Sequence, residues 1–317
     1  MNNLESAMPK IYILDPFHSD GVEMVRPHAE LVMWDDPARA NWPEDADALM
    51  VRMTPITAAD LKRAKKLKLV CKQGVGYDTI DIAAARELGI PVSRTPGVNS
   101  EAVAELALAL ALAVGRRVGE FDRLLRAGSP TQRASLLGVE LTGKKVGVVG
   151  MGNIGTLAAR KWHYGLGAQL LAVDPYVEAE RWSDIPHTRM TLDEMLPQAD
   201  VLTLHAPLTE ETRNLIAAPQ LAKMKKDAII INCARGGMVN EADLYAAIKS
   251  GHIFGAGLDV FEVEPPPADH PLLSLPTVLA TPHAAAGTRE TQSRSATRVA
   301  EQVIEVLQGK PARNRVV

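Results

Sequence analysis

The sequence KVGVVGMGNIG, residues 145–155, decides the fold prediction. An apolar run leads into a G-x-G-x-x-G motif, and the following residues 156–163 have a helical pattern. In such a motif the first glycine, Gly150, permits a tight turn, and Gly152 lets the backbone approach a pyrophosphate. Gly155 allows the helix to pack closely on the strand, and the helix N-terminus offers unpaired N–H groups to the anion. We therefore predict a strand–turn–helix unit that binds a dinucleotide.

The next apolar run, Leu170–Asp174, ends in a carboxylate nineteen residues after Gly155. An acid at this place accepts hydrogen bonds from the ribose hydroxyls of adenosine and repels a 2′-phosphate. The motif therefore favours NAD over NADP, with Asn153 and Ile154 lying in the phosphate-binding turn. A methyltransferase that uses S-adenosylmethionine can have a similar turn and acidic residue, so the motif alone leaves the chemistry open.

Apolar runs alternate with helical patterns on both sides of this motif, which is typical of βαβ units and parallel sheets. The strands expected before the motif are Ile11–Asp15, Leu31–Trp34, Ala48–Arg52, Leu69–Gln73 and Pro91–Arg94. Six more are expected from Lys144 onward, the number found in two mononucleotide-binding halves: Lys145–Val149, Leu170–Asp174, Val201–His205, Ala228–Asn232, Gly255–Val260 and Val278–Thr281. The expected helices include Thr57–Lys66, Thr79–Leu88, Ala102–Val118, Thr156–His163 and Thr288–Leu307. The predicted fold class is α/β with two doubly wound domains.

A turn at Thr95-Pro96-Gly97 separates the two series, and Asn99-Ser100 supplies a cap for the helix expected over Ala102–Val118. That helix is apolar on nearly every side, so we expect it to be buried. A position in an ordinary core and one between domains or subunits both fit the pattern. The following segment, Gly119–Leu141, has Gly128-Ser129-Pro130 at its centre, and we expect it to be irregular.

Length and charge exclude several classes of protein. The chain has 317 residues, enough for two domains of about 150 residues that need no disulfide or metal for stability. Lys and Arg number 35 against 38 Asp and Glu, a net charge of −3, and no long block of like charge occurs. Because aromatic residues are also few and scattered, we expect no nucleic-acid binding. We expect no metal site either, because the two cysteines each lie in an apolar run and fit buried thiols better than a zinc site.

Three features indicate a soluble cytoplasmic protein. Cys71 and Cys233 each lie in an apolar run, which fits buried thiols in a reducing compartment. The first ten residues lack the basic and apolar regions of a secretory signal. The longest apolar stretch, Ala102–Val114, contains Glu105 and is too short to span about 30 Å of hydrocarbon.

Polar side chains follow the apolar runs of the second series. His205, Arg235, Asp259, Glu264 and His283 all come at or just after the ends of expected strands, where open parallel sheets bind their ligands. An arginine, an acid and a histidine can together polarise a carbonyl, orient an imidazole and move a proton. Singly, they also fit a helix-capping cation, a solvated loop charge and a core imidazole. Their coincidence beside a dinucleotide motif favours a catalytic site.

Five motifs in fixed order carry a family resemblance: VGVVGMGNIG (146–155), HAPLTEETRNLI (205–216), INCARGGMVNEADL (231–244), GAGLDVFEVEP (255–265) and TPHAAAGT (281–288). Together with KQGVGYDTIDIAAARELGIPVSRTPGVNSEAVAE (72–105), they extend the resemblance from Leu69 to Thr288. The sequence resembles the D-isomer-specific 2-hydroxyacid dehydrogenases, and it looks closest to their phosphoglycerate dehydrogenase-like branch. The resemblance implies an NAD-dependent oxidoreductase that interconverts a D-2-hydroxyacid and its 2-oxoacid.

The resemblance also implies an architecture. A flavodoxin-like substrate domain would comprise residues 1–98 and 288–317, and a Rossmann NAD domain, residues 99–287, would be inserted into it. The last helix would then belong to the substrate domain. A homodimer is implied as well, formed through the helix at 102–118 and the segment that follows it.

Roles of single residues follow from the same resemblance. Arg235 is implied to bind the substrate carboxylate and carbonyl oxygen, His283 to transfer the proton, and Glu264 to orient the imidazole and favour its charged form. Asp259 is implied to bind the nicotinamide carboxamide. The other residues implied to contact the cofactor are His205, Pro207, Thr212, Cys233, Ala234, His283 and Ala285.

Substrate contacts are expected from the first domain too. The backbone N–H groups of Val75 and Gly76, in a glycine-rich turn after an expected strand, can bind a carboxylate. Arg52 ends the preceding expected strand, Ala48–Arg52, and adds a cation at the mouth of the cleft, unless it is an ordinary surface arginine. Arg94 stands where many relatives have Asn, which leaves the distal group of the substrate open. Asn153 stands where many have Arg, which predicts weaker pyrophosphate binding.

Two alternatives stay open. A glyoxylate or hydroxypyruvate reductase would use the same motifs, whereas Glu264 argues against relatives of formate dehydrogenase, in which another residue partners the histidine. Outside the enzymes, the same fold serves as an NAD(H)-sensing corepressor that binds peptides.

Overall fold

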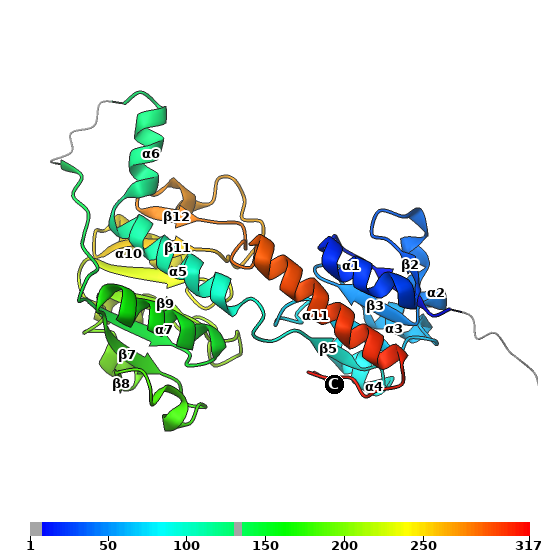
Figure 1. Ribbon diagram of the computed structural model, residues 1–317. Coiled ribbons are helices and arrows are strands. Elements are labelled where there is room, and N and C mark those ends of the chain that lie inside the picture. The colour runs from blue at the N-terminus through cyan, green and yellow to red at the C-terminus, as the bar shows by residue number, and fades with distance from the viewer. Residues whose placement is uncertain (1–7, 130–134) are drawn as a thin grey trace, which may run out of the picture. The chain divides into compact units, whose positions relative to one another are not determined.

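The computed structural model describes residues 8–129 and 135–317. Contacts within the chain divide it into two compact units. Unit 1 comprises Met1–Asn99 and Gly287–Val317, and unit 2 comprises Ser100–Ala286. Each unit is built on its own parallel sheet, so the predicted α/β class is confirmed (Figure 1).

The sheet of unit 1 has five parallel strands in the order β2-β1-β3-β4-β5. They are β1 (Lys10–Ile13), β2 (Glu30–Val32), β3 (Ala48–Val51), β4 (Leu69–Lys72) and β5 (Val92–Arg94). This is the flavodoxin-like order, in which ligands bind beyond the carboxyl ends of the strands. Every residue of β3 and β4 is buried, as expected of central parallel strands covered on both faces.

Helices flank this sheet: α1 (Ser19–Val25), η1 (Arg26–His28), η2 (Pro37–Asn41), α2 (Trp42–Asp45), α3 (Ala58–Arg63), α4 (Ile82–Glu87) and α11 (Arg289–Leu307). The helix α11 comes from the end of the chain and packs on α1, β3 and β4. Gly21 of α1 makes this packing close, because a Cβ there would lie 2.6 Å from the Ala296 backbone. The side chain of Thr57 begins α3 with a capping box.

The sheet of unit 2 has seven parallel strands in the order β12-β11-β10-β9-β6-β7-β8. They are β6 (Lys145–Val149), β7 (Gln169–Val173), β8 (His187–Arg189), β9 (Val201–Leu204), β10 (Ala228–Asn232), β11 (Ile253–Leu258) and β12 (Val278–Ala280). The prediction of six strands was one short. The missing strand, β8, is a three-residue edge strand of sequence HTR with no buried residue, so no apolar run marks it.

The helices of unit 2 are α5 (Ser100–Gly115), α6 (Val118–Arg126), α7 (Asn153–Leu166), η4 (Ala179–Trp182), α8 (Leu192–Met195), α9 (Ala218–Lys223), α10 (Glu241–Lys249) and η5 (Pro271–Ser274). The prediction of one helix over Ala102–Val118 was wrong at its end. Arg117 has a φ of +52°, a left-handed conformation that ends α5 before α6 begins. The prediction that Gly119–Leu141 is irregular was wrong for α6, and its residues 130–134 lie outside the described ranges.

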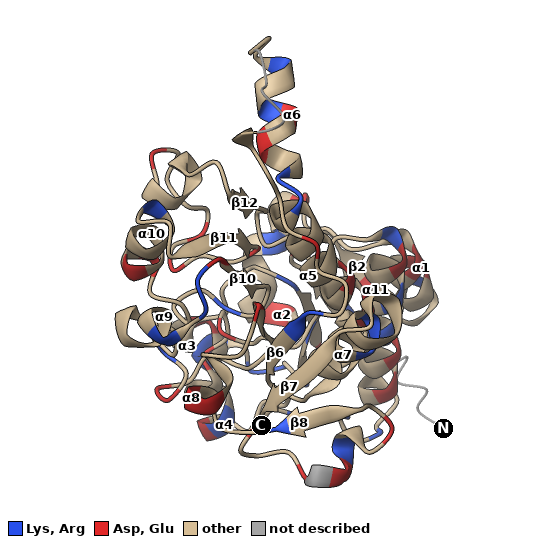
Figure 2. Cartoon of the chain, turned by 90° about the vertical axis from the view of Figure 1, so that its left-hand side faces the viewer, with Lys and Arg blue, Asp and Glu red and all other residues tan. Residues whose placement is uncertain are grey.

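The two helices differ in burial. α5 packs on β10, β11 and α7, and a Cβ added to Gly257 would lie 2.7 Å from Leu110 Cβ, so the expected burial of this helix is confirmed. By contrast, α6 projects away from the sheet of unit 2 (Figures 1 and 2) and has no buried residue. Val118 and Leu125 on α6 are 54% and 69% exposed. Acidic and basic residues alternate over the surface helices (Figure 2), in keeping with the small net charge.

Both cysteines are free and buried, as predicted, and burial raises the pKa of the Cys71 and Cys233 thiols. Over residues 8–129 and 135–317, no helix is long and apolar enough to cross a membrane. Within the same ranges, His, Cys, Asp and Glu side chains form no group of three or more that could hold a metal ion.

Candidate active site

The glycine-rich turn joins β6 to α7. Gly150 has a φ of +98°, and a Cβ there would lie 2.6 Å from the His205 carbonyl oxygen. A Cβ on Gly155 would lie 1.9 Å from the Gly150 carbonyl oxygen, so the helix can approach the strand only with glycine at this position. A Cβ on Gly152 would meet nothing within 4 Å. The space beside Gly152, at the N-terminus of α7, is where a phosphate group fits.

A guanidinium lies beside the same helix terminus. Arg181 of η4 donates a hydrogen bond of 2.8 Å to Oδ1 of Asn153, the first residue of α7. A cation at a helix N-terminus is disfavoured by the helix dipole, unless an anion binds there as well. The chain therefore has a basic group at this turn, although position 153 itself is Asn.

Asp174 follows β7 and ties two segments together. Its carboxylate accepts hydrogen bonds from the N–H groups of Met151, at 2.8 Å, and of Tyr176 and Val177, at 2.9 and 3.1 Å. The acid thus lies directly beside the glycine-rich turn. The hydroxyl of Tyr176 donates to Glu211, so a second carboxylate lies near this end of the sheet.

His205 follows β9 and is neutral. Burial lowers its pKa to about 4, because an imidazolium would lose its hydration. Its Nε2 lies 2.9 Å from the Thr203 hydroxyl, while Nδ1 is buried and has no hydrogen-bond partner within the described ranges. In the next turn the hydroxyl of Thr212 donates to the Pro207 carbonyl at 2.6 Å, which fixes the loop after β9.

Arg235 is positioned by a buried amide at the end of β10. Asn232 is 2% exposed, and its Nδ2 donates to the Arg235 carbonyl at 2.9 Å. Its Oδ1 accepts from the Ala234 N–H at 3.0 Å, so one side chain closes the turn over Cys233 and Ala234. The guanidinium of Arg235 donates to the Ala234 carbonyl at 2.7 Å.

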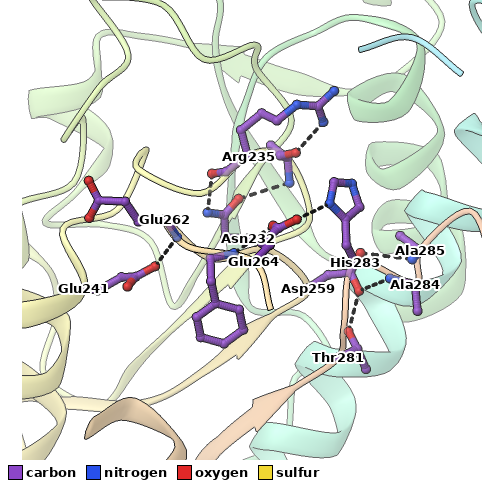
Figure 3. A network of polar contacts seen from close by, with 12 residues as sticks. Asn232, Arg235, Glu241, Asp259, Glu262, Glu264, Thr281, His283, Ala284 and Ala285 are labelled. Atoms are coloured by element: carbon purple, nitrogen blue, oxygen red, sulfur yellow. Dashed lines mark hydrogen bonds and ion pairs between the residues drawn. The ribbon is translucent and has the colours of Figure 1, made fainter. Parts of the chain in front are cut away.

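His283 and Glu264 face each other at the ends of β12 and β11 (Figure 3). The His283 Nδ1 donates to Glu264 Oε2 at 2.7 Å, an assignment that follows because a carboxylate only accepts. His283 has a φ of +52°, an unusual conformation for a residue with a side chain. Nε2 is the ring nitrogen left for a substrate.

Asp259 holds the segment that carries His283. It is 1% exposed, and its carboxylate accepts from the Thr281 hydroxyl at 2.5 Å and from the N–H groups of Ala284 and Ala285 at 2.7 and 3.0 Å (Figure 3). Its carbonyl also accepts from the His283 N–H at 2.8 Å. These contacts offset the cost of the left-handed conformation.

In unit 1, the predicted substrate residues lie after three neighbouring strands. Arg52 follows β3, Val75 and Gly76 follow β4, and Arg94 ends β5. The Arg94 guanidinium donates to the Val75 carbonyl at 3.3 Å, so it lies against the glycine-rich turn. The Gly74 N–H is already bound, at 2.7 Å, by the Thr95 hydroxyl.

The backbone at Arg52 is held by two buried charges that sequence reasoning missed. Asp15, 8% exposed, accepts from the N–H groups of Arg52, Met53 and Thr54 at 2.5, 3.0 and 3.1 Å. Lys72, 7% exposed, donates to the Arg52 carbonyl. The only sequence signal for Asp15 is a carboxylate at the end of an expected strand, Ile11–Asp15.

Unit 2 thus combines a dinucleotide-binding turn with an arginine, a glutamate and a histidine at the carboxyl ends of one parallel sheet, which defines an NAD(P)-type oxidoreductase domain. The family profile of the D-isomer specific 2-hydroxyacid dehydrogenase, NAD binding domain, matches residues 108–285. The chain belongs to the D-isomer specific 2-hydroxyacid dehydrogenase family.

Similar proteins cover nearly the whole chain. D-3-phosphoglycerate dehydrogenase of Methanocaldococcus jannaschii is 41% identical over 314 residues, which are 98% of this chain and 59% of that protein. Glyoxylate reductase of Korarchaeum cryptofilum is 39% identical over 318 residues, 97% of this chain and 96% of that protein. The crystal structure of the TT0316 protein from Thermus thermophilus is 36% identical, covers 97% of this chain and 100% of its own, and has a TM-score of 0.88.

Proposed function

We propose that the protein is an NAD-dependent dehydrogenase that interconverts a D-2-hydroxyacid and its 2-oxoacid, similar to phosphoglycerate dehydrogenase. The observation that carries the proposal is the 2.7 Å contact between His283 Nδ1 and Glu264 Oε2. It fixes the imidazole in one orientation and directs Nε2 to the substrate. Such a pair transfers protons, and it lies in the unit that contains the dinucleotide-binding turn.

The residues of unit 2 fit NAD. The open side of Gly152 and the N–H groups at the start of α7 suit a pyrophosphate, and Asp174 suits an adenosine ribose without a 2′-phosphate. The unpartnered Nδ1 of His205 can bind a polar group of the cofactor. When bound, NAD supplies the acceptor or donor of the hydride. The predicted contact of Asp259 with the carboxamide belongs to this proposal.

His283 performs the proton transfer. In the direction of reduction, the imidazolium donates the Nε2 proton to the oxygen of the substrate carbonyl, and the Glu264 carboxylate stabilises the positive ring. In the direction of oxidation, the neutral ring accepts the proton of the hydroxyl at the same nitrogen. Arg235 binds the substrate carboxylate and carbonyl oxygen, because a guanidinium offers two parallel N–H groups to a planar anion.

We assign cofactor binding to unit 2 and further substrate-binding residues to unit 1. The N–H groups of Val75 and Gly76 bind the substrate carboxylate, and Arg52 contributes a cation. Three N–H groups at residues 52–54 are occupied by Asp15, so this loop contributes the Arg52 side chain and not its backbone. The adjacent Arg94 suits a substrate with a distal acceptor group.

Two further properties are proposed. Homodimer formation through α5 and α6 would cover the exposed Val118 and Leu125, and sedimentation at 34 kDa would contradict it. A cytoplasmic location fits the two free, buried thiols. Export of the full-length protein in cell fractionation would contradict it.

The oxidation of NADH in the presence of a panel of 2-oxoacids tests the proposed activity. We expect turnover with phosphohydroxypyruvate, hydroxypyruvate or glyoxylate, and little with NADPH. Preference for glyoxylate or hydroxypyruvate would favour the alternative reductase. A protein that binds NADH and turns over none of them would favour the NAD(H)-sensing alternative.

A further inference from the structure

Two side chains outside the predicted site contact the loop that carries Glu264. The first is Glu241, at the start of α10, whose Oε1 accepts from the Glu262 N–H at 2.7 Å (Figure 3). The second is His270, whose Nε2 lies 3.0 Å from Glu241 Oε2. Both side chains are largely buried, with exposures of 18% and 15%. The largely buried Glu241 carboxylate thus accepts two hydrogen bonds, and one of the donors belongs to the loop of Glu264.

The loop lies against the turn of Arg235. A Cβ on Gly236 would lie 1.8 Å from the Phe261 carbonyl oxygen and 2.6 Å from the Glu262 nitrogen. The peptide between Phe261 and Glu262 is therefore enclosed, with the Gly236 backbone on one side and the Glu241 carboxylate bound to its N–H. If the Glu241 contact is lost, no other protein group in the described ranges binds the Glu262 N–H, and the peptide can rotate away from Gly236.

The adjoining peptide, between Val260 and Phe261, determines where Glu264 lies. The Phe261 N–H donates to Glu264 Oε1 at 3.0 Å, while Oε2 accepts from His283. One oxygen of Glu264 is thus held by the loop backbone and the other holds the imidazole. The connection from Glu241 to His283 consists of three hydrogen bonds and the backbone of Phe261, which joins the Glu262 N–H to the Phe261 N–H.

His270 supports the far side of this connection. Because Glu241 only accepts, Nε2 of His270 carries the proton, and the ring packs edge-on against Phe261 with centroids 5.5 Å apart. Phe261 is 4% exposed. The first turn of α10 also favours a negative charge at Glu241.

We propose that Glu241 is a positioning residue for the reaction: by binding the Glu262 N–H it fixes the loop 261–264, and so keeps Glu264 on Nδ1 of His283. The expected kinetic effects of this role rest on the proposed function. The expected structural effects do not, because the hydrogen bonds between Glu241, the loop and Glu264 are present whatever reaction the protein catalyses.

Three variants test the proposal. Glu241→Ala removes the acceptor, whereas Glu241→Gln retains an amide oxygen for the Glu262 N–H. Asp243→Ala is the matched control, because Asp243 lies in the same first turn of α10 but accepts from the Ala218 N–H at 2.8 Å, away from the loop. A loss of activity that Glu241→Ala and Asp243→Ala share would reflect only damage to α10.

Two readouts are measured on the full chain. For reduction of the best 2-oxoacid, we expect Glu241→Ala to lower kcat about tenfold with KM changed less than about twofold. Amide hydrogen exchange should accelerate at both Glu262 and Phe261. Glu241→Gln and Asp243→Ala should behave like the wild type in kcat and in exchange at these two amides.

The outcomes separate the two claims. Faster exchange at Glu262 but unchanged exchange at Phe261 would overturn the positioning role, since Glu264 would then have stayed in place. So would an equal loss of kcat in Asp243→Ala. A wild-type protein that reduces no 2-oxoacid contradicts the proposed function, and the exchange at Phe261 then decides the positioning role alone.

Discussion

Asp259 makes the sharpest prediction about how the site is held together. Its two carboxylate oxygens accept three hydrogen bonds from the segment 281–285, which carries His283 in a left-handed conformation. Asp259→Asn keeps the shape but replaces one acceptor by an NH₂ group. That group faces N–H or O–H donors and cannot accept from them.

Two magnitudes follow from this geometry. At least one N–H, the part-buried one of Ala284 or the buried one of Ala285, loses its partner and the remaining bonds lose their charge assistance, which costs about 2–4 kcal/mol of unfolding free energy. The left-handed conformation of His283 costs about 1–2 kcal/mol, which the bound segment now offsets. If His283 leaves the left-handed conformation, the fraction of protein molecules in the active conformation falls about 5- to 30-fold, and kcat falls with it.

Urea unfolding measures the first magnitude, and NADH oxidation with the best 2-oxoacid measures the second. The fluorescence of Trp162 and Trp182, both fully buried in unit 2, reports on the relevant unit. Thr281→Val is the matched control: it removes only the hydroxyl bond to Asp259 and should cost about 1 kcal/mol with kcat nearly unchanged. An Asp259→Asn variant as stable and as active as the wild type would refute the reasoning.

Other predictions concern single side chains. His283→Ala should lower kcat at least about a hundredfold while the Kd for NADH stays nearly constant, which titration calorimetry can check; unchanged turnover would show that another group supplies the proton. Arg235→Lys should not restore the activity lost in Arg235→Ala, because an ammonium lacks the fork geometry, and near-wild-type kcat/KM in the lysine variant would contradict this role. Burial lowers the pKa of His205 to about 4 in the folded chain, whereas the imidazole of the unfolded chain has a pKa of about 6.5. Below about pH 6.5 the unfolded chain therefore binds a proton at His205 that the folded chain does not, and the free energy of unfolding falls. Lowering the pH from 7 to 5 should therefore cost the wild type about 2 kcal/mol more unfolding free energy than His205→Gln; equal losses would contradict a buried neutral ring. Arg181→Ala should raise the Kd for NADH about threefold to tenfold, whereas Arg160→Ala, on α7 but paired with Asp184, should not.

Periodicity predicted the main elements because buried parallel strands are apolar throughout. β10, for example, has sequence AIIIN with every residue buried, and its predicted range Ala228–Asn232 matches the structure. β8 has no apolar signal because an exposed edge strand needs none. α6 was missed because the glycines and proline near residue 128 suggested a loop, and nothing in the sequence marks the left-handed Arg117 that starts a new helix.

Site residues at strand ends could be found from the sequence, since strand ends converge at one edge of a parallel sheet. Glu264 and His283 are nineteen residues apart and follow different strands, yet the structure brings them to 2.7 Å. The roles of Asn232, Glu241 and Asp15 could not be found in this way, although Asn232 and Asp15 also end expected strands. Each acts through backbone N–H or carbonyl groups, those of the next turn for Asn232 and those of distant segments for Glu241 and Asp15, and such contacts leave no periodic or motif signal in a single sequence.

The central claim is that the chain transfers a hydride and a proton to a 2-oxoacid on the side that yields the D product. The most direct measurement is to consume NADH against the best 2-oxoacid and to resolve the product by chiral chromatography. The account predicts one D-2-hydroxyacid formed for each NADH oxidised, and almost no product with His283→Ala over the same time. An L or racemic product, or product formation undiminished in His283→Ala, would contradict it.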